Sequence, residues 1–403
     1  AQTAKRAGGV AAAEMVSHGL LDEVTQLVER PFPLEGAFDA KYLALPREVL
    51  LASMAKYQRV FAIEAKGKIL PRFVAILEGK PGRPNDVRTV IERILNARLA
   101  DSLMFVSEDR KRPMEDLIAG LSGVTFHEKL GSMQDKTSRL RKLAASVEGA
   151  WQLSREETEH LRRACELAKA DLVTAMVKEF PTLQGVMGKH YAKAAGEPEA
   201  VAQAIEEHYL PLAGKAPKTL IGSALAIIDK YDTLASYFSV GIEPTGDQDP
   251  FGLRRAAQGI VEVAWAMQRS LPLSSLFEGN ADVAGRLKSY LFDRLYTFAW
   301  PEPVPAADLV DAVRASPWDD LVDAMNRIVS LQKLNGTPGL RKAAKVIERT
   351  RNILKGAPAS LPHVDPARLQ ESPERTLWDR LSSREAQRVV ELAERRSYAD
   401  ATI

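Results

Sequence analysis

Cysteine is almost absent from this sequence, since Cys165 is the only one among 403 residues. A single cysteine excludes an intramolecular disulfide framework and a zinc finger built on cysteine pairs. The surrounding text, RRACELAKA, is helical in character and favours a small buried side chain over a nucleophile. Because scarce cysteine is typical of a reducing compartment, we expect a cytoplasmic protein.

Long apolar runs are missing as well. No stretch of about 18 uncharged apolar residues occurs, so the sequence predicts no membrane span and no membrane partner. The first residues, AQTAKRAGGVAAAEM, lack the apolar segment of a signal peptide, which predicts that there is no targeting peptide. Neither end carries a capping signal, and we expect the chain to be a fragment of a longer protein or a shortened form.

Positive and negative charges are nearly balanced, and the standard catalytic sequence signatures are missing. The chain has 55 lysines and arginines against 53 aspartates and glutamates, a formal net charge of +2. Such a protein can bind nucleic acid only through local basic faces. The patterns GxxxxGK[ST], GxGxxG, HExxH and GxSxG have no match. The sequence therefore predicts no self-sufficient active site.

Strand character is confined to the N-terminal third of the sequence. Two β-branched runs within residues 59–77 flank a Lys-Gly-Lys turn, which predicts a β-hairpin turning at Gly67. Apolar residues then recur at helical spacing over residues 87–99, which predicts an amphipathic helix. Residues 10–30 also have helix-forming character, and Pro31 should end that helix together with Pro33.

From about residue 127 the text is rich in Ala, Leu, Glu and Lys and is broken by short turns, which is typical of helices. The whole pattern predicts an α+β fold that is predominantly helical. We expect a small α/β domain over residues 1–126, a helical domain over residues 127–270, and a helical body and tail over residues 271–403.

One group of residues is suited to a hard metal ion on helices: Asp171, His190, His208 and Asp229. The segment AIIDKYD resembles the last Asp-bearing helix of HD-superfamily metal phosphohydrolases, which hold a cation that activates water. That superfamily has an adjacent His-Asp pair, whereas Lys169 and Ala170 precede the aspartate here. We expect an HD-like scaffold without a metal, in which Asp171 and Asp229 cap helices or pair with lysines. A metal-dependent phosphohydrolase is the alternative.

Two basic faces are the other candidates for function. Residues 341–355, RKAAKVIERTRNILK, carry six basic residues against one glutamate, partly on one side of a helix. A second cluster follows Asp247, Asp249 and Pro250 at a predicted helix start, where two arginines either face RNA phosphates or pair with these acids. A solvated helix face has the same composition as an RNA-binding one. The candidate RNA contacts are Arg254, Arg255, Lys342, Lys345, Arg349 and Arg351.

Several stretches closely resemble one protein family. EFPTLQGVMG, PTGDQDPFGLRRAA and the longer text around them are similar to the β subunit of the bacterial two-subunit glycyl-tRNA synthetase. The matching stretches follow the order of that family from about residue 20 to about residue 265. RTRNIL and VDPARLQESPERTLWDRL resemble the same subunit more loosely. The resemblance thus covers most of the chain.

The resemblance implies a tRNA-binding, non-catalytic partner of an α subunit. In that family the α subunit carries a class II active site that makes glycyl-adenylate from ATP and glycine. ATP and Mg²⁺ would therefore be used by the α subunit, and this chain would bind no cofactor of its own. Its partners would be the α subunit and tRNA(Gly). The resemblance also implies an inactive HD-like domain and, at the C-terminus, the start of a truncated anticodon-binding domain.

Overall fold

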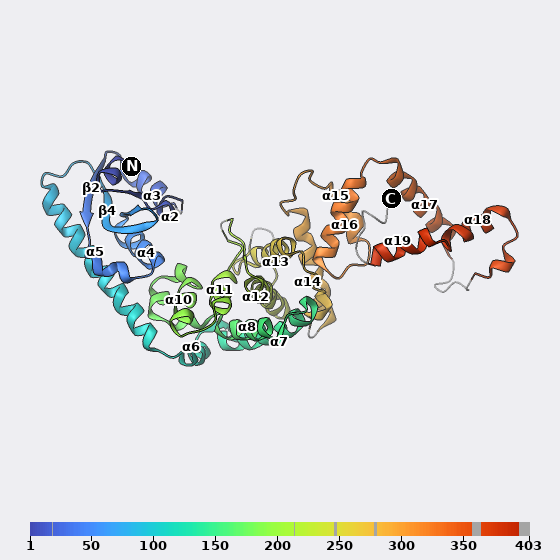
Figure 1. Cartoon of the computed structure of the whole chain (residues 1–403), viewed down its shortest axis with the longest axis horizontal. Coiled ribbons are helices and arrows are strands. Elements are labelled where there is room, and N and C mark those ends of the chain that lie inside the picture. The colour runs from blue at the N-terminus through green and yellow to red at the C-terminus, as the bar shows by residue number, and fades with distance from the viewer. Residues whose placement is uncertain (18, 213, 246–247, 278–279, 357–363, 395–403) are drawn as a thin grey trace. The chain divides into compact units, whose positions relative to one another are not determined.

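The computed structural model describes the chain except for residues 18, 213, 246–247, 278–279, 357–363 and 395–403. The chain forms two compact units: residues 1–145 with 153–232, and residues 146–152 with 233–403. The boundary falls inside two long helices, α7 (Met133–Trp151) and α12 (Leu220–Ser239), which both units share (Figure 1). The three-part division at residues 126 and 270 stays a prediction.

The first unit contains a four-stranded sheet in the order β1–β3–β4–β2. Figure 1 labels two of its strands, β2 and β4. Strands β3 (Phe61–Ala65) and β4 (Lys68–Glu78) form the predicted hairpin. Lys66 and Gly67 both have positive φ, of 50° and 75°, as a two-residue turn of type I′ requires. All strand pairs in this sheet are antiparallel. The N-terminal region, which the sequence predicted to be an α/β domain, therefore has an α+β arrangement.

The helix expected over residues 10–30 is wrong in part. Strand β1 (Val10–Ala11) comes first, followed by the short helices α2 (Ala13–Ser17) and α3 (Leu20–Leu27). Pro31 and Pro33 were expected to end a helix. Instead α3 ends at Leu27, and both prolines lie in strand β2 (Pro31–Ala37). This strand is at the edge of the sheet and pairs only with β4, and edge strands tolerate proline.

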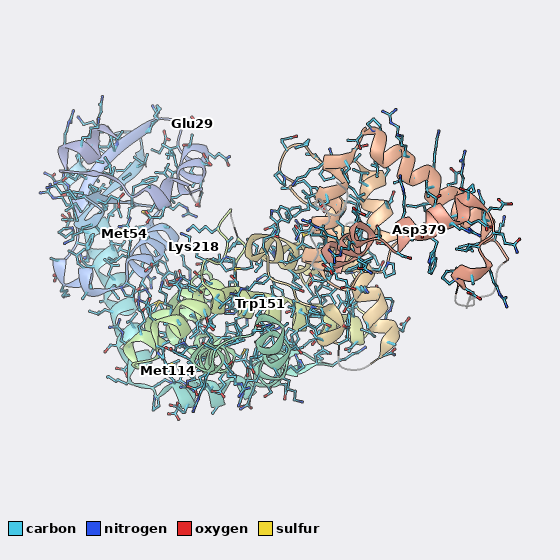
Figure 2. All side chains as sticks on the ribbon, turned by 45° about the vertical axis from the view of Figure 1, so that its right-hand side comes forward. Glu29, Met54, Met114, Trp151, Lys218 and Asp379 are labelled. Atoms are coloured by element: carbon cyan, nitrogen blue, oxygen red, sulfur yellow. The ribbon has the colours of Figure 1, made fainter. Side chains whose placement is uncertain are left out.

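Three helices pack on the sheet. Helix α1 (Gln2–Arg6) contributes Ala4 to a buried cluster with Ile63 and Val74 of the sheet. Helix α5 (Pro84–Lys111) contains the helix predicted over residues 87–99 and packs against β2 and α4 (Arg47–Gln58). The buried hydroxyls of Ser53 and Ser102 are 3.0 Å apart between α4 and α5, and Met54 of α4, labelled in Figure 2, is fully buried.

The rest of the first unit is helical apart from one short pair of strands, β5 (Thr125–His127) and β6 (Gly131–Ser132). Beyond β6, every regular element in the described part of the chain is a helix, which confirms the predominantly helical fold. The further α-helices of this unit are α6 (Met114–Gly120), α8 (Arg155–Leu167), α9 (Ala175–Glu179), α10 (Val186–Ala194) and α11 (Glu199–Glu207). Its 3-10 helices are η1 (Ala40–Ala44), η2 (Leu121–Gly123), η3 (Ala170–Val173) and η4 (Pro181–Leu183).

The second unit has a packed part and an exposed part. Arg269 donates to the backbone oxygen of Trp151 at 3.0 Å, which ties the end of α7, where Figure 2 labels Trp151, into this unit. The packed part contains α13 (Leu253–Met267), η5 (Leu273–Ser275), α14 (Ala281–Asp293), η6 (Arg294–Tyr296), α15 (Ala307–Arg314) and α16 (Leu321–Leu334). The exposed part contains α17 (Pro338–Ile353), η7 (Pro366–Arg368), α18 (Ser372–Leu381) and α19 (Arg384–Glu394), whose described side chains are not buried. No described helix is both long and apolar enough to cross a membrane.

Candidate functional sites

A group of buried charged side chains lies in the first unit. Lys169 directly precedes η3, and its Nζ is 2.7 Å from Nε2 of His208 and 3.2 Å from Oδ2 of Asp229. Each of these three residues is less than a tenth exposed. The lysine also lies over the ring of Tyr209, 4.2 Å from its centroid. A buried lysine therefore occupies the space between two of the proposed metal ligands.

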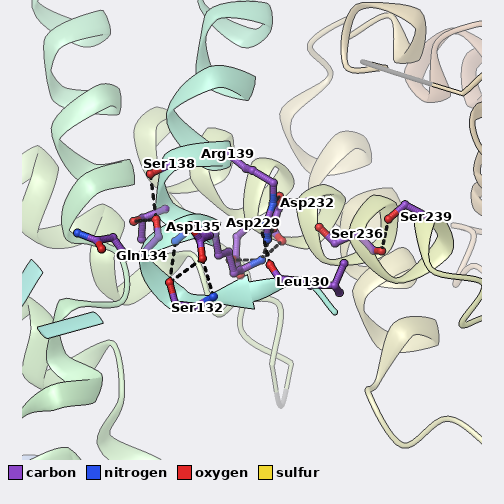
Figure 3. A network of polar contacts seen from close by, with 12 residues as sticks. Leu130, Ser132, Gln134, Asp135, Ser138, Arg139, Asp229, Asp232, Ser236 and Ser239 are labelled. Atoms are coloured by element: carbon purple, nitrogen blue, oxygen red, sulfur yellow. Dashed lines mark hydrogen bonds and ion pairs between the residues drawn. The ribbon is translucent and has the colours of Figure 1, made fainter. Parts of the chain in front are cut away.

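A second lysine reaches the same aspartate from α7. Nζ of Lys136 lies 3.2 Å from Oδ1 of Asp229 and 2.9 Å from Oδ2 of Asp232. Nε of Arg139 lies 2.6 Å from Oδ1 of Asp232, and Figure 3 shows Arg139 extending from α7 toward this aspartate on α12. Ion pairs thus join α7 to α12. We call the following five residues the lysine–aspartate cluster: Lys136, Lys169, His208, Asp229 and Asp232.

Burial and the neighbouring charges act in opposite directions on the pKa values of the buried side chains in this cluster. Burial would raise the pKa of Asp229, but Lys136 and Lys169 lower it far below the ordinary range. Burial would lower the pKa of Lys136, but Asp229 and Asp232 raise it. Burial lowers the pKa of Lys169, and the charge of Asp229 opposes this effect.

The imidazole of His208 is neutral in this environment. Burial, and next the charge of Lys169, lower its pKa well below the ordinary value of 6.5. Its Nδ1 lies 2.6 Å from the backbone oxygen of Ile205, and a neutral ring that donates there has an acceptor at Nε2. Nε2 can then accept a hydrogen bond from the ammonium group of Lys169, as the 2.7 Å distance indicates.

Asp171 acts on the backbone of α10. Its Oδ2 accepts hydrogen bonds from the backbone N–H groups of Gly185 and Gly188, at 2.6 and 3.1 Å. Burial raises the pKa of Asp171 to about 6, although both N–H groups oppose this effect. A Cβ on Gly188 would lie 2.6 Å from Cγ2 of Ile205, so glycine permits the close approach of α10 and α11. Capping by Asp171 and pairing of Asp229 with lysines match the arrangement that the sequence predicted for a scaffold.

The fourth candidate metal ligand lies elsewhere. Nε2 of His190 is 3.2 Å from Oε2 of Glu48 on α4, and both side chains are partly exposed. The structure thus brings His208 and Asp229 together around Lys169 but leaves His190 apart. Among the described residues, no three or more His, Cys, Asp or Glu side chains are arranged to hold a metal ion. The residues present at the cluster do not fit a divalent cation, because lysine contacts both ligand atoms.

The first basic face lies at the start of α13. The carboxylate of Asp249 accepts hydrogen bonds from the backbone N–H groups of Leu253 and Arg254, at 2.8 and 2.9 Å. It therefore caps the helix, as its place before the predicted helix start allows. The side chain of Arg255 is exposed, whereas Arg254 is half-buried. Asp247, the other acid considered for pairing, lies outside the described residues.

The second basic face lies on α17. Thr337 caps this helix by accepting a hydrogen bond from the N–H of Leu340 at 3.3 Å, and Pro338 occupies the first turn. No described residue of the helix is buried, and even Val346 is 62% exposed. We call the four candidate residues here the α17 basic face; in the described structure they are all exposed and form no ion pair: Lys342, Lys345, Arg349 and Arg351.

Sequence reasoning missed Lys136, although the sequence holds a signal for it. On α7 it continues a stripe of buried residues spaced by four and three, namely Leu140, Ala144, Val147 and Trp151. A lysine on the apolar side of an amphipathic helix needs a buried acidic partner. The partners, Asp229 and Asp232, lie more than 90 residues away in the sequence. The spacing of residues along α7 therefore could not identify them.

Comparisons with known proteins give a consistent result. The model of the glycyl-tRNA synthetase beta subunit family matches residues 1–315. The chain is 40% identical over 366 residues to the glycine–tRNA ligase beta subunit of Trichodesmium erythraeum, which covers 84% of this chain and 51% of that protein. It is 38% identical over 344 residues to the subunit of the same name from Bacillus subtilis, with 84% and 50% covered. It is 39% identical over 379 residues to the subunit of the same name from Streptococcus pyogenes serotype M6, which covers 90% of this chain and 55% of that protein.

The chain spans about half the length of these curated relatives. The family model, however, matches well over half of this chain, including the sheet, the lysine–aspartate cluster and the start of α13. The chain therefore belongs to the glycyl-tRNA synthetase beta subunit family.

Proposed function

We propose that this chain binds tRNA(Gly) in the cytoplasm and, as a non-catalytic β subunit, supports the attachment of glycine by an α subunit that uses ATP and Mg²⁺. Membership of the family supports a role in glycyl-tRNA synthesis. The missing nucleotide-binding motifs support the division of labour, because adenylate formation needs charged groups arranged around the ATP phosphates.

The α17 basic face is the observation that favours tRNA as a direct ligand. Its side chains are exposed and form no ion pair with described residues, so RNA phosphates would not compete with an existing partner. Phosphate contacts release counterions and supply much of the affinity for nucleic acid. Arg255 at the start of α13 offers a second exposed cation on the same unit. Double-helical RNA presents few readable base edges, so shape and backbone contacts would dominate in a tRNA stem.

Glycylation of tRNA tests the subunit role. The α subunit should be assayed for charging of tRNA(Gly) with and without this chain, and each protein alone for glycine-dependent ATP–pyrophosphate exchange. We expect charging to increase when the chain is added, and no exchange by the chain alone. Exchange above background by the isolated chain would contradict its non-catalytic role. Unchanged charging would contradict its supporting role.

Salt-dependent tRNA binding tests the basic faces. One variant replaces Lys342, Lys345 and Arg349 by glutamine, and a second replaces Arg254 and Arg255. A control with the same loss of charge as the triple variant replaces Lys66, Lys68 and Lys80, which are exposed near the sheet. Loss of three phosphate contacts should flatten the slope of log affinity against log salt by roughly 2 to 3, whereas the control should keep the slope. Equal slopes for the triple variant and the wild type would show that α17 does not hold the tRNA.

A further inference from the structure

Phe251 is an exposed aromatic residue just before helix α13. Its ring stacks on the ring of Tyr237 on α12, with the centroids 4.5 Å apart and the planes inclined by 27°. Tyr237 is only 4% exposed, whereas Phe251 is 43% exposed. Because Tyr237 covers one face of the Phe251 ring, the exposed surface belongs mainly to the other face and the edge. The chain thus presents a flat apolar surface on a buried support.

The backbone around Phe251 holds this ring in place. Pro250 precedes it, and proline restricts the backbone dihedral angle φ. The carboxylate of Asp249 accepts hydrogen bonds from the backbone N–H groups of Leu253 and Arg254, which fixes the first turn of α13. A side chain that is already ordered loses little entropy when a ligand stacks on it.

An arginine lies close to the exposed ring. A Cβ on Gly252 would be 3.1 Å from Nη2 of Arg255, so the guanidinium group lies beside the residue that follows Phe251. The side chain of Arg255 is exposed and forms no ion pair with a described residue. A guanidinium group binds phosphate oxygens, and a flat aromatic face stacks on nucleobases. Together these two groups suit one unpaired nucleotide of RNA.

The surroundings of the ring favour a single flat ligand over a protein surface. Within the described residues of the range 214–295, Phe251 is the only large apolar side chain that is exposed. A protein interface has an apolar core made of several side chains, whereas one ring is sufficient to stack on one base. The isolated ring beside a cation therefore fits RNA better than a protein partner.

We propose that Phe251 stacks on an unpaired base of RNA and that Arg255 contacts the phosphate next to this base. The inference rests on the proposed binding of tRNA and adds a contact of a different kind from those of the α17 basic face. Stacking releases no counterions from the RNA. Loss of the ring should therefore weaken binding by the same factor at every salt concentration, whereas loss of the arginine should also change the salt dependence.

The experiment compares four variants of the full chain. Phe251→Leu keeps an apolar side chain on Tyr237 but removes the flat ring, and Phe251→Trp restores an aromatic face. Arg255→Gln removes the cation. Tyr296→Leu is the control, because Tyr296 is an aromatic residue of the same unit with a similar exposure of 39%. The probes are tRNA(Gly) and a six-nucleotide single-stranded RNA with a central 2-aminopurine, a base whose fluorescence falls on stacking. Kd is measured at several salt concentrations, and Tm reports the fold.

We expect Phe251→Leu to raise the Kd for both RNAs about fivefold or more without changing the slope of log affinity against log salt. Phe251→Trp and Tyr296→Leu should stay within about twofold of the wild type. Arg255→Gln should flatten the slope for the single strand by roughly 0.7. The fluorescence of 2-aminopurine should fall on binding to the wild type and fall less on binding to Phe251→Leu.

Separate outcomes would contradict this inference and the proposed function. If the wild type binds tRNA(Gly) and Phe251→Leu has the same Kd, the inference is overturned and the proposed function stands. If the wild type binds the single strand through Phe251 but does not bind tRNA(Gly), the stacking contact is supported and the proposed function fails. Binding of neither RNA would contradict both. Weaker binding of an α subunit by Phe251→Leu, with unchanged RNA affinity, would assign the ring to a protein interface and overturn the inference. If Phe251→Leu does not fold, unchanged 2-aminopurine fluorescence on binding to the wild type would overturn it as well.

Discussion

The carboxylate of Asp109 on α5 accepts a hydrogen bond from the hydroxyl of Tyr191 on α10, at 2.8 Å and across 82 residues of sequence. The same carboxylate accepts hydrogen bonds from the backbone N–H groups of Ala175 and Met176 at the start of α9, at 2.8 and 3.0 Å. Asp109 is only 3% exposed. One buried carboxylate thus connects the long helix behind the sheet to the helices around η3.

Replacing Asp109 by alanine should destabilise the first unit. Three donors lose their acceptor in the interior, and we expect a loss of about 2 to 4 kcal/mol in the free energy of unfolding. Tyr191→Phe removes a single hydrogen bond and should cost about 1 kcal/mol. Urea unfolding measures both values. Glu108→Ala is the control, because Glu108 is exposed and, among the described residues, forms an ion pair with Lys111 alone, on the same helix. A loss as large as that of Asp109→Ala would contradict the role of burial.

Asp171 should make folding depend on pH in the acidic range. Its pKa is about 6 in the folded chain against 3.8 as the ordinary value, so the folded state binds the proton more tightly. The resulting stabilisation is fully present below about pH 4 and is lost as the pH rises through about 6. The side-chain amide of an Asp171→Asn variant cannot ionise. The unfolding free energy of the wild type minus that of this variant should therefore fall by up to about 3 kcal/mol between pH 4 and pH 7. A difference that is constant or rises over this range would contradict the prediction.

Gly36 should not tolerate alanine. It pairs with Phe73 across β2 and β4, and a Cβ there would lie 2.3 Å from the tip of that buried ring. Because the ring has little room to move, we expect Gly36→Ala to lose about 1 to 3 kcal/mol in the free energy of unfolding. Gly82→Ala is a matched control, since a Cβ at Gly82 meets no atom within 4 Å. Similar urea midpoints for both variants would argue against close packing at Gly36.

The α17 basic face should contribute little to stability. Because its side chains are exposed and form no ion pair with described residues, charge removal costs no internal contact. We expect the triple glutamine variant of Lys342, Lys345 and Arg349 to stay within about 0.5 kcal/mol of the wild type. Circular dichroism during urea unfolding measures this value. A markedly larger loss would show that these residues have a structural role, and weakened tRNA binding could then not be assigned to lost phosphate contacts.

The fold was predictable where local chemistry decides it. The turn at Gly67 and the apolar spacing over residues 87–99 predicted the hairpin and the core of α5. Strand β2 was missed because prolines normally exclude a strand, and only the position at the edge of the sheet makes Pro31 and Pro33 acceptable there. Edge position is a property of the whole sheet, so a local pattern cannot reveal it.

The candidate site shows the same limit. The residues next to Asp171 in the sequence are enough to predict that a lysine replaces a metal ligand there. In the structure, Lys169 contacts His208 and Asp229. The pairing of His190 with Glu48 could not be predicted, because 142 residues separate them. Contacts between distant elements depend on how helices pack, and helical periodicity specifies only which side of each helix is buried.

The two prolines of β2 also bear on association between molecules. Backbone N–H groups alternate in direction along a strand, and the N–H of Ala37 points away from β4 to Oε1 of Glu92 at 2.8 Å. Positions 31 and 33 share this outward direction, but proline has no N–H group to offer. An incoming strand would therefore find few hydrogen-bond donors along this edge. The two prolines thereby make β2 a poorer template for an added strand than an edge with all its N–H groups would be.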